Sequence, residues 1–87
     1  MDIEYDPAKD AANREKHGVS LVLGRIVLAN PVGEEAEERD DCGELRRIAY
    51  GLIRDRLFVC VYTLRGDTRR IISVRKANRR EQRRWLL

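Results

Sequence analysis

The stretch RLFVCVYTLRGDTRRIISVRK, residues 56–76, decides the fold of this chain. Its first ten residues, Arg56–Arg65, contain an unbroken apolar run, which predicts a strand buried on both faces at the centre of a sheet. The link RGD, residues 65–67, is typical of a tight turn. The run after it, Thr68–Lys76, alternates in part between apolar and polar side chains. The stretch therefore predicts two antiparallel strands joined by a hairpin.

The segment before this hairpin, residues 44–54, reads ELRRIAYGLIR and alternates, with Ile48, Tyr50 and Leu52 on one face. It predicts a third strand, so that three consecutive strands form an antiparallel meander. Residues 33–44, further back, are acidic and poorly periodic. They fit a short edge strand followed by a loop, because charged side chains keep an exposed edge from pairing with other chains.

Two helices are predicted before the strands. Asp6 suits an N-cap and Pro7 the first helical position, where a missing N–H costs nothing. Gly18 can end this helix in the left-handed conformation. Ser20 can cap a second helix over residues 21–30, which carries apolar residues at helical spacing. The short connection predicts an αα-hairpin.

The chain ends with a third predicted helix. Asn78 followed three residues later by Glu81 resembles a capping box, and Trp85 with Leu86 can dock the helix. Residues 2–5, DIEY, form a short candidate strand. We therefore predict one α+β domain over residues 1–87, in which an N-terminal helical hairpin and a C-terminal helix pack on an antiparallel β-sheet.

Composition limits the class of protein. A chain of 87 residues has room for one hydrophobic core, and 43% hydrophobic residues are enough to fill it. No run of about 18 apolar residues is present, and the acidic N-terminus lacks an apolar signal segment, so we expect no membrane span and a cytoplasmic location. Cys42 and Cys60 lack the spacing of a metal site. Cys60 lies in an apolar run and is expected to be a buried thiol.

The net charge of +3 hides a strong asymmetry. Residues 33–44 contain seven acidic side chains and one arginine, whereas residues 65–84 contain nine basic side chains and two acidic ones. Such a division suggests one surface that faces a polyanion and a separate acidic surface. Arginine dominates the basic part, and its planar fork matches phosphate better than a lysine does.

Two candidate sites lie at the ends of the predicted hairpin. Arg75 and Lys76 precede the N-terminus of the last helix, where free N–H groups and the helix dipole favour an anion. The alternative is a solvated basic tail, or arginines paired with the chain's own acidic segment. Tyr62 and Arg65 lie at the other end of the central strand and form the second candidate site, although the residue types favour a core residue and a turn residue there.

His17 is the only histidine, in the sequence Lys16-His17-Gly18. Histidine is the usual proton shuttle near neutral pH, but a cation in the last turn of a helix is also favoured by the dipole. Glu44 and Arg46 also allow two interpretations: an internal ion pair, or a carboxylate base beside an arginine. Spacing alone favours the helix-ending role for His17, and it does not decide between the alternatives for Glu44 and Arg46.

The sequence contains no Gly-rich phosphate loop, zinc-ligand spacing or serine-nucleophile motif. This inventory favours a mechanism without a metal or other cofactor. RNA cleavage fits it, because the 2′-hydroxyl of the substrate attacks the phosphate. The protein then has to supply only proton shuttles and cations.

Three stretches together resemble the BrnT toxins of type II toxin–antitoxin systems. They are YDPAKDAANREKHGVS (residues 5–20), GELRRIAYGL (residues 43–52) and VYTLRGDTRRIISVRKANRREQRR (residues 61–84). Residues that match the family include Lys9, Asn13 and Ser73. Two positions depart from the family pattern, since Arg47 stands where tryptophan is usual and Ile3 where an aromatic residue is usual.

The resemblance implies a RelE-like fold and an endoribonuclease that blocks translation. It also implies neutralisation by a BrnA-like ribbon-helix-helix antitoxin, with operator DNA contacted only through the complex. The residues expected to act in catalysis are His17, Glu44, Tyr62, Arg65 and Arg75. Those expected to bind RNA are Lys16, Arg46, Lys76, Arg79, Arg80, Arg83 and Arg84. The alternative is a non-catalytic module that binds its antitoxin and helps it repress the operon, as would follow if the acidic segment 34–41 covered Arg65 and Arg75.

Overall fold

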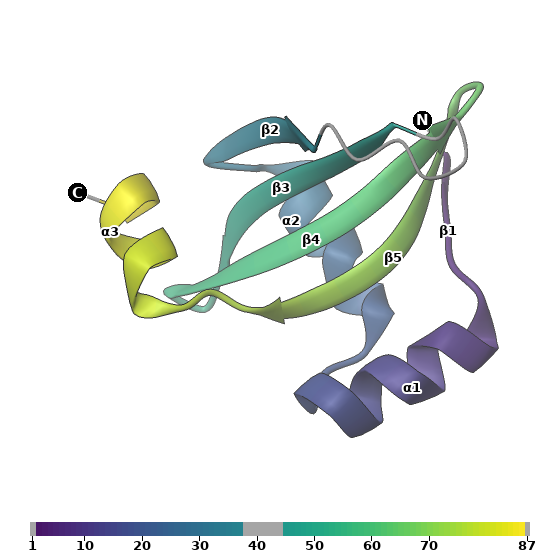
Figure 1. The fold of residues 1–87 in the computed structure, drawn as a ribbon, viewed down its shortest axis with the longest axis horizontal. Helices are drawn as coiled ribbons and strands as arrows, with labels where there is room; N and C mark the ends of the chain where they lie inside the picture. The colour runs from purple at the N-terminus through teal and green to yellow at the C-terminus, as the bar shows by residue number, and fades with distance from the viewer. Residues whose placement is uncertain (1, 38–44, 87) are drawn as a thin grey trace.

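The computed structural model describes residues 2–37 and 45–86 (Figure 1). The elements follow in the order β1 (Asp2–Glu4), α1 (Pro7–His17), the 3₁₀ turn η1 (Leu21–Leu23), α2 (Gly24–Ala29), β2 (Gly33–Glu37), β3 (Arg46–Ile53), β4 (Arg56–Arg65), β5 (Thr68–Lys76) and α3 (Arg79–Leu86). The five strands form one sheet in the order β1-β5-β4-β3-β2. The predicted α+β class is confirmed. None of the helices in these two ranges is long and apolar enough to span a membrane.

Strand β4 lies at the centre of the sheet, as its unbroken apolar run predicted. It pairs antiparallel with β3 on one side and with β5 on the other, so the predicted meander is confirmed. Arg54 and Asp55, between β3 and β4, both have positive φ, as a two-residue turn that follows the sheet twist requires. Gly66, between β4 and β5, also has positive φ. The acidic segment contributes the edge strand β2, next to β3.

Strand β1 corrects the prediction of a wholly antiparallel sheet. It pairs parallel with β5, with Asp2 opposite Thr68 and Glu4 opposite Arg70. A strand of three residues carries too few side chains to reveal its partner or its direction. Its direction follows from the route of the chain, which leaves β1 and enters α1 beside the same strand, β5 (Figure 1).

The second predicted helix, over residues 21–30, is divided and shorter. Residues 21–23 form η1, and α2 extends only from Gly24 to Ala29. The Ser20 cap is present, since its hydroxyl accepts the Val22 N–H at 3.2 Å. Gly24 lies close against the sheet, where a Cβ would come 2.7 Å from Ile71 Cδ1. This close approach favours glycine, a poor helix former, at the point where the helix was expected to be continuous.

The two faces of the sheet carry separate apolar clusters, because successive strand residues point to opposite sides. Figure 1 shows α2 behind the sheet, α1 beyond β5, and α3 at one end. The cluster under η1 and α2 contains Leu21, Val27, Leu28, Ala49, Phe58, Cys60, Tyr62, Ile71 and Val74. The other contains Tyr50, Leu57, Val59 and Ala77, with Ile48 and Trp85 against it. The predicted buried thiol is confirmed at Cys60, whose pKa burial raises to about 12.

Helix α3 docks on the second face through Trp85. The indole ring stacks on Tyr50 with centroids 4.7 Å apart, and a Cβ at Gly33 would overlap it. The predicted capping box is confirmed: the Glu81 N–H donates to the Asn78 side chain at 2.8 Å, and the Asn78 N–H donates to the Glu81 carboxylate at 2.9 Å. These contacts fix the start and the end of α3.

Candidate functional site: a cationic pocket between α1 and β5

Asn13 fixes α1 against the open edge of β5. Strand β1 covers β5 only as far as Arg70, so the backbone edge beyond it needs other partners. The Asn13 side chain donates to the Val74 carbonyl at 2.8 Å and accepts the Val74 N–H at 3.2 Å. It also donates to the Val19 carbonyl at 2.9 Å. One buried amide therefore replaces a neighbouring strand and holds the helix along β5.

A β-bulge in β5 faces this helix. Val61 pairs with Ser73 and Tyr62 pairs with Ile71, so Ile72 is an extra residue in β5. Bulges re-aim side chains and are frequent beside active sites. Here the bulge brings both Ile72 and Ser73 to the wall that faces α1.

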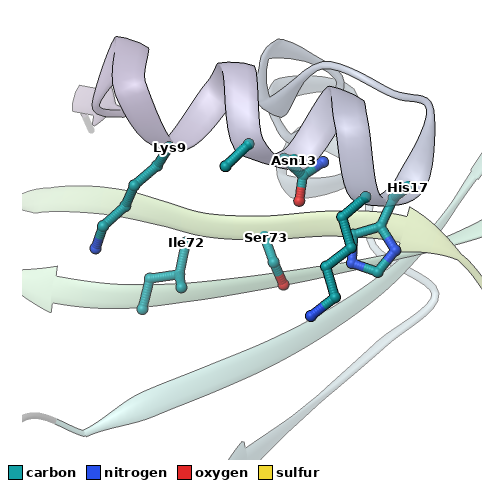
Figure 2. A pocket seen from close by; sticks show the side chains of 7 residues that line it. Lys9, Asn13, His17, Ile72 and Ser73 are labelled. Carbon is teal, nitrogen blue, oxygen red and sulfur yellow. The ribbon is translucent and has the colours of Figure 1, made fainter.

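Between α1 and the bulge lies a pocket of about 200 Å³, lined by Lys9, Ala12, Asn13, Lys16, His17, Ile72 and Ser73 (Figure 2). The four polar residues from α1 fall at spacings of i, i+4, i+7 and i+8, which is one face of a helix. Lys9 lies at one end of the pocket and His17 at the other, with Ile72 and Ser73 across from them. None of the described residues that line it is acidic. The pocket is therefore complementary to an anion.

Asp10, the carboxylate next to this face of α1, is held away from the pocket by η1. It accepts the Leu21 N–H at 2.7 Å and the Ser20 hydroxyl at 2.8 Å. These bonds, the Leu21 N–H first, hold the pKa of Asp10 below its usual value, and Arg14 pairs with the same carboxylate at 3.3 Å. The acid thus stabilises the connection from α1 to η1, and its charge faces these partners and not the pocket.

Of the predicted site residues, Lys16 and His17 line the pocket together. His17 is the last residue of α1, and Gly18 ends the helix in the left-handed conformation, as predicted. Arg75 lies two residues beyond Ser73, but both of its terminal nitrogens bind the Glu81 carboxylate at 2.8 Å. Its charge is therefore already engaged by α3.

Arg65 lies at the opposite end of the β4–β5 hairpin from Arg75. Arg65 pairs with Thr68, whereas Arg75 pairs with Val59, six residues earlier in β4. At about 3.3 Å per strand residue this separation is about 20 Å. The structure therefore does not bring these two predicted residues together, and His17 lies near the Arg75 end.

Tyr62 is buried and does not line the pocket. Its hydroxyl donates to the Glu34 carboxylate at 2.7 Å, and Arg69 lies over its ring at 5.5 Å. Burial, followed by the hydrogen bond to Glu34, raises the pKa of Tyr62 to about 12. A phenol in this state is a poor proton shuttle at neutral pH, and its contacts tie the edge strand β2 to the centre of the sheet.

The remaining predicted residues are placed as follows. Glu44 lies outside the described residues, as do Cys42 and residues 38–41 of the acidic segment. Arg46 begins β3, and Lys76 ends β5 and is exposed. The α3 residues Arg79, Arg80 and Arg83 are exposed, while Arg84 pairs with Glu35 at 2.7 Å and lies over Trp85.

Sequence reasoning left Lys9 and Ser73 out of the predicted site. The helical spacing of Lys9, Asn13, Lys16 and His17 was a usable signal, because it places all four on one face. Ser73 had no such signal. Its place in the pocket depends on the bulge, which shifts the strand by one residue and cannot be read from alternation.

The fold and pocket define a small basic α+β protein with a cationic pocket beside its sheet. Residues 5–81 match the model of a protein family described as the ribonuclease toxin BrnT of type II toxin–antitoxin systems. The chain therefore belongs to this family, and the resemblance found in the sequence is confirmed. Every residue that lines the pocket lies within the matched range. No curated protein matches the chain.

Proposed function

We propose that this chain is an endoribonuclease toxin that cleaves RNA at the pocket between α1 and β5 without a metal ion. The family describes a ribonuclease toxin, which implies an RNA substrate and an antitoxin partner. The observation that carries the proposal is the gathering of Lys9, Lys16, His17 and Ser73 around one pocket. The wider proposal includes a RelE-like arrangement, inhibition of translation in the cytoplasm, and neutralisation by a BrnA-like ribbon-helix-helix antitoxin that alone contacts operator DNA.

The reaction removes a proton from the 2′-hydroxyl of the substrate and adds a proton to the leaving 5′-oxygen. The 2′-oxygen of the substrate forms a bond to phosphorus as its proton passes to water or a base, and the bond from phosphorus to the 5′-oxygen breaks. His17, at the C-terminal end of α1, gives a proton to the leaving 5′-oxygen. Lys16 stabilises the charge that develops on the phosphate, and the Ser73 hydroxyl can donate to a phosphate oxygen. The products are a 2′,3′-cyclic phosphate and a 5′-hydroxyl.

The backbone of a longer RNA would continue from the pocket toward α3. Lys76 follows Ser73 along β5, and α3 begins three residues later with Arg79. Arg79, Arg80 and Arg83 are exposed on that helix. In this proposal Arg75 positions α3 through Glu81, while Arg65, Arg46 and Arg84 lie outside the reacting centre.

The test is cleavage of RNA by the purified chain, with product ends identified. The wild type is expected to cleave in EDTA and to leave a cyclic phosphate. His17→Asn should lower the rate about 10²- to 10⁴-fold, the usual contribution of a general acid or base. Arg25→Ala, an exposed arginine on α2 outside the pocket, is the charge control and should retain full activity. Intact RNA with the wild type would refute the nuclease proposal, and loss of cleavage in EDTA would refute the metal-free mechanism.

The alternative is a non-catalytic module that binds its antitoxin and helps it repress the operon. The observation that favours it is the Arg75–Glu81 pair, which neutralises one predicted catalytic arginine inside the chain. Expression without the antitoxin distinguishes the two. A nuclease slows growth and degrades RNA unless His17 is replaced, whereas the module leaves both unchanged.

A further inference from the structure

We infer that Lys9 binds a second phosphate of the RNA, next to the phosphate that is cleaved at the His17 end. This inference rests on the proposed function, since it assigns the scissile phosphate to Lys16, His17 and Ser73. It adds that the pocket selects a strand carrying at least two successive phosphates. Lys9 is then a substrate-binding residue that determines the minimum length of the substrate.

The separation of the two ends of the pocket supports a second phosphate. Lys9 and His17 are eight residues apart on α1, which is about 12 Å along the helix axis. Figure 2 shows the Lys9 side chain extended away from His17, with Ile72 and Ser73 in the space between. A charge-assisted hydrogen bond to phosphate spans only about 2.7–2.9 Å. In this arrangement one phosphate group does not reach both side chains.

The middle of the pocket is not built to hold charge. Ala12, which lies between Lys9 and Lys16 on α1, and Ile72, across from the helix, supply apolar surface there. Asn13 also lines it, but its amide is already bonded to Val74 and Val19. The pocket therefore has cations at both ends and an uncharged centre. A nucleic acid strand has the matching pattern, with uncharged sugars between its charged phosphates.

The experiment compares short substrates that differ by one phosphate. A dinucleoside monophosphate has only the scissile phosphate, and the same dinucleotide with a terminal phosphate on its 5′ or 3′ side has two. Binding is measured first with 2′-O-methyl analogues, which cannot be cleaved through the 2′-oxygen, by titration monitored with NMR. Cleavage of the matching ribonucleotides is then measured for the wild type, Lys9→Ala, Lys9→Arg, Lys16→Ala and Arg25→Ala.

The wild type should bind and cleave one of the two phosphorylated dinucleotides about 2- to 5-fold better than the plain one, as expected for one exposed charge pair. Lys9→Ala should remove this advantage, because it weakens the phosphorylated dinucleotide more than the plain one, and Lys9→Arg should restore it. Lys16→Ala should weaken the binding and cleavage of all of the substrates. Arg25→Ala should not change the binding or cleavage of any of them.

An equal loss on all substrates with Lys9→Ala, no loss on any, or no phosphate advantage in the wild type would overturn the inference. Failure to bind any of the analogues would overturn it as well. Binding that depends on Lys9 and on the second phosphate, but without cleavage of any ribonucleotide, would instead uphold the subsite and refute the nuclease proposal.

Discussion

Asn13 is a polar residue with only 6% of its surface exposed, in the middle of a helix. Such a burial is costly unless the side chain is fully hydrogen-bonded. Its three bonds meet this requirement, and two of them connect α1 to Val74, 61 residues away in the chain. The pocket depends on this one side chain, since its bonds hold α1 directly to the backbone of β5.

Replacing Asn13 with alanine should destabilise the protein by about 2–3 kcal/mol, because each lost bond contributes about 1 kcal/mol. For a domain of this size about 1 kcal/mol corresponds to a fall in Tm of about 4–8 °C. Thermal unfolding followed by circular dichroism measures the change. The matched control is Glu15→Ala, an exposed residue on the same helix, which should leave Tm nearly unchanged. An unchanged Tm for Asn13→Ala would show that water replaces the amide at Val74 and that the hydrogen bonds of Asn13 are dispensable for stability.

The contrast between Asn13 and the helix caps shows what could be predicted from the sequence. Asp6, Gly18 and the pair Asn78–Glu81 act within four residues of their partners, so the sequence alone places them correctly. Lys16 and His17 could be predicted as neighbours for the same reason. Asn13, Ser73 and the distance between Arg65 and Arg75 depend on how remote segments meet, which local pattern does not encode.

At the scale of elements, α3 is held by a small number of contacts with separate origins. Its N-terminus has the capping box and the Arg75–Glu81 pair, and its C-terminal turn has Trp85 on Tyr50. The exposed like charges at Arg79 and Arg83 disfavour the isolated helix slightly. We therefore expect the stability of α3 to depend on the charge of Glu81.

The pH dependence of protein stability should show how much the charge of Glu81 contributes. The bonds from Arg75, foremost, and the Asn78 N–H lower the pKa of Glu81 below its ordinary value of 4.5, against the opposing effect of burial. A lowered pKa in the folded state stabilises the protein above the unfolded value, and the stabilisation is lost as the pH falls through the folded value. Glu81→Gln should therefore lower Tm at pH 7, by an amount that corresponds to about 1 kcal/mol or less.

The difference in Tm between wild type and Glu81→Gln should shrink below pH 4.5 and vanish in stronger acid. Glu15→Gln, on the exposed side of α1, is the control and should leave Tm nearly unchanged at every pH. A difference between wild type and Glu81→Gln that stays constant from pH 7 into acid would assign the effect to lost packing and not to the ion pair.

For the strands, as for the side chains, the sequence predicts contacts between neighbouring segments but not between remote ones. The β3–β4–β5 meander joins neighbours in sequence through two-residue turns, so alternation and turn residues are sufficient to predict it. The pairing of β1 with β5 joins the first strand of the chain to the last in parallel, and no local signal marks it. This unpredicted pairing determines where the pocket forms. Strand β1 ends opposite Arg70, so the bulge of β5 beyond that point faces α1 and not another strand.

At the scale of the whole molecule, the cationic pocket and the acidic strand β2 lie on opposite sides of the central strand β4. The cationic pocket lies at β5, and the edge strand β2 carries Glu34 and Glu35. The Glu34 carboxylate binds Tyr62, and the Glu35 carboxylate binds Tyr50 and Arg84, so these two acidic residues stabilise the fold. A polyanion should therefore approach the molecule from the part of β5 that β1 leaves uncovered, where α1 ends and α3 begins.

The salt dependence of RNA binding tests whether RNA binds on this side of the molecule. Each phosphate contact to single-stranded nucleic acid contributes about −0.7 to the slope of log K against log salt, because a bound counterion is released. Arg79 and Arg83 lie one helical turn apart and line a shallow hollow with Gln82 and Leu86. If both contact RNA, the double variant Arg79→Ala, Arg83→Ala should flatten the slope by about 1.4. Arg25→Ala removes one charge elsewhere and should leave it unchanged.

The measurement is fluorescence anisotropy with a labelled 2′-O-methyl oligonucleotide at several salt concentrations. Arg84 is kept in both variants, because its pair with Glu35 and its place over Trp85 hold α3 in position. A double variant that keeps the wild-type slope would show that the RNA leaves the pocket by another route. The exposed face of α3 would then be available for the antitoxin, and loss of antitoxin binding by the same double variant would establish that role.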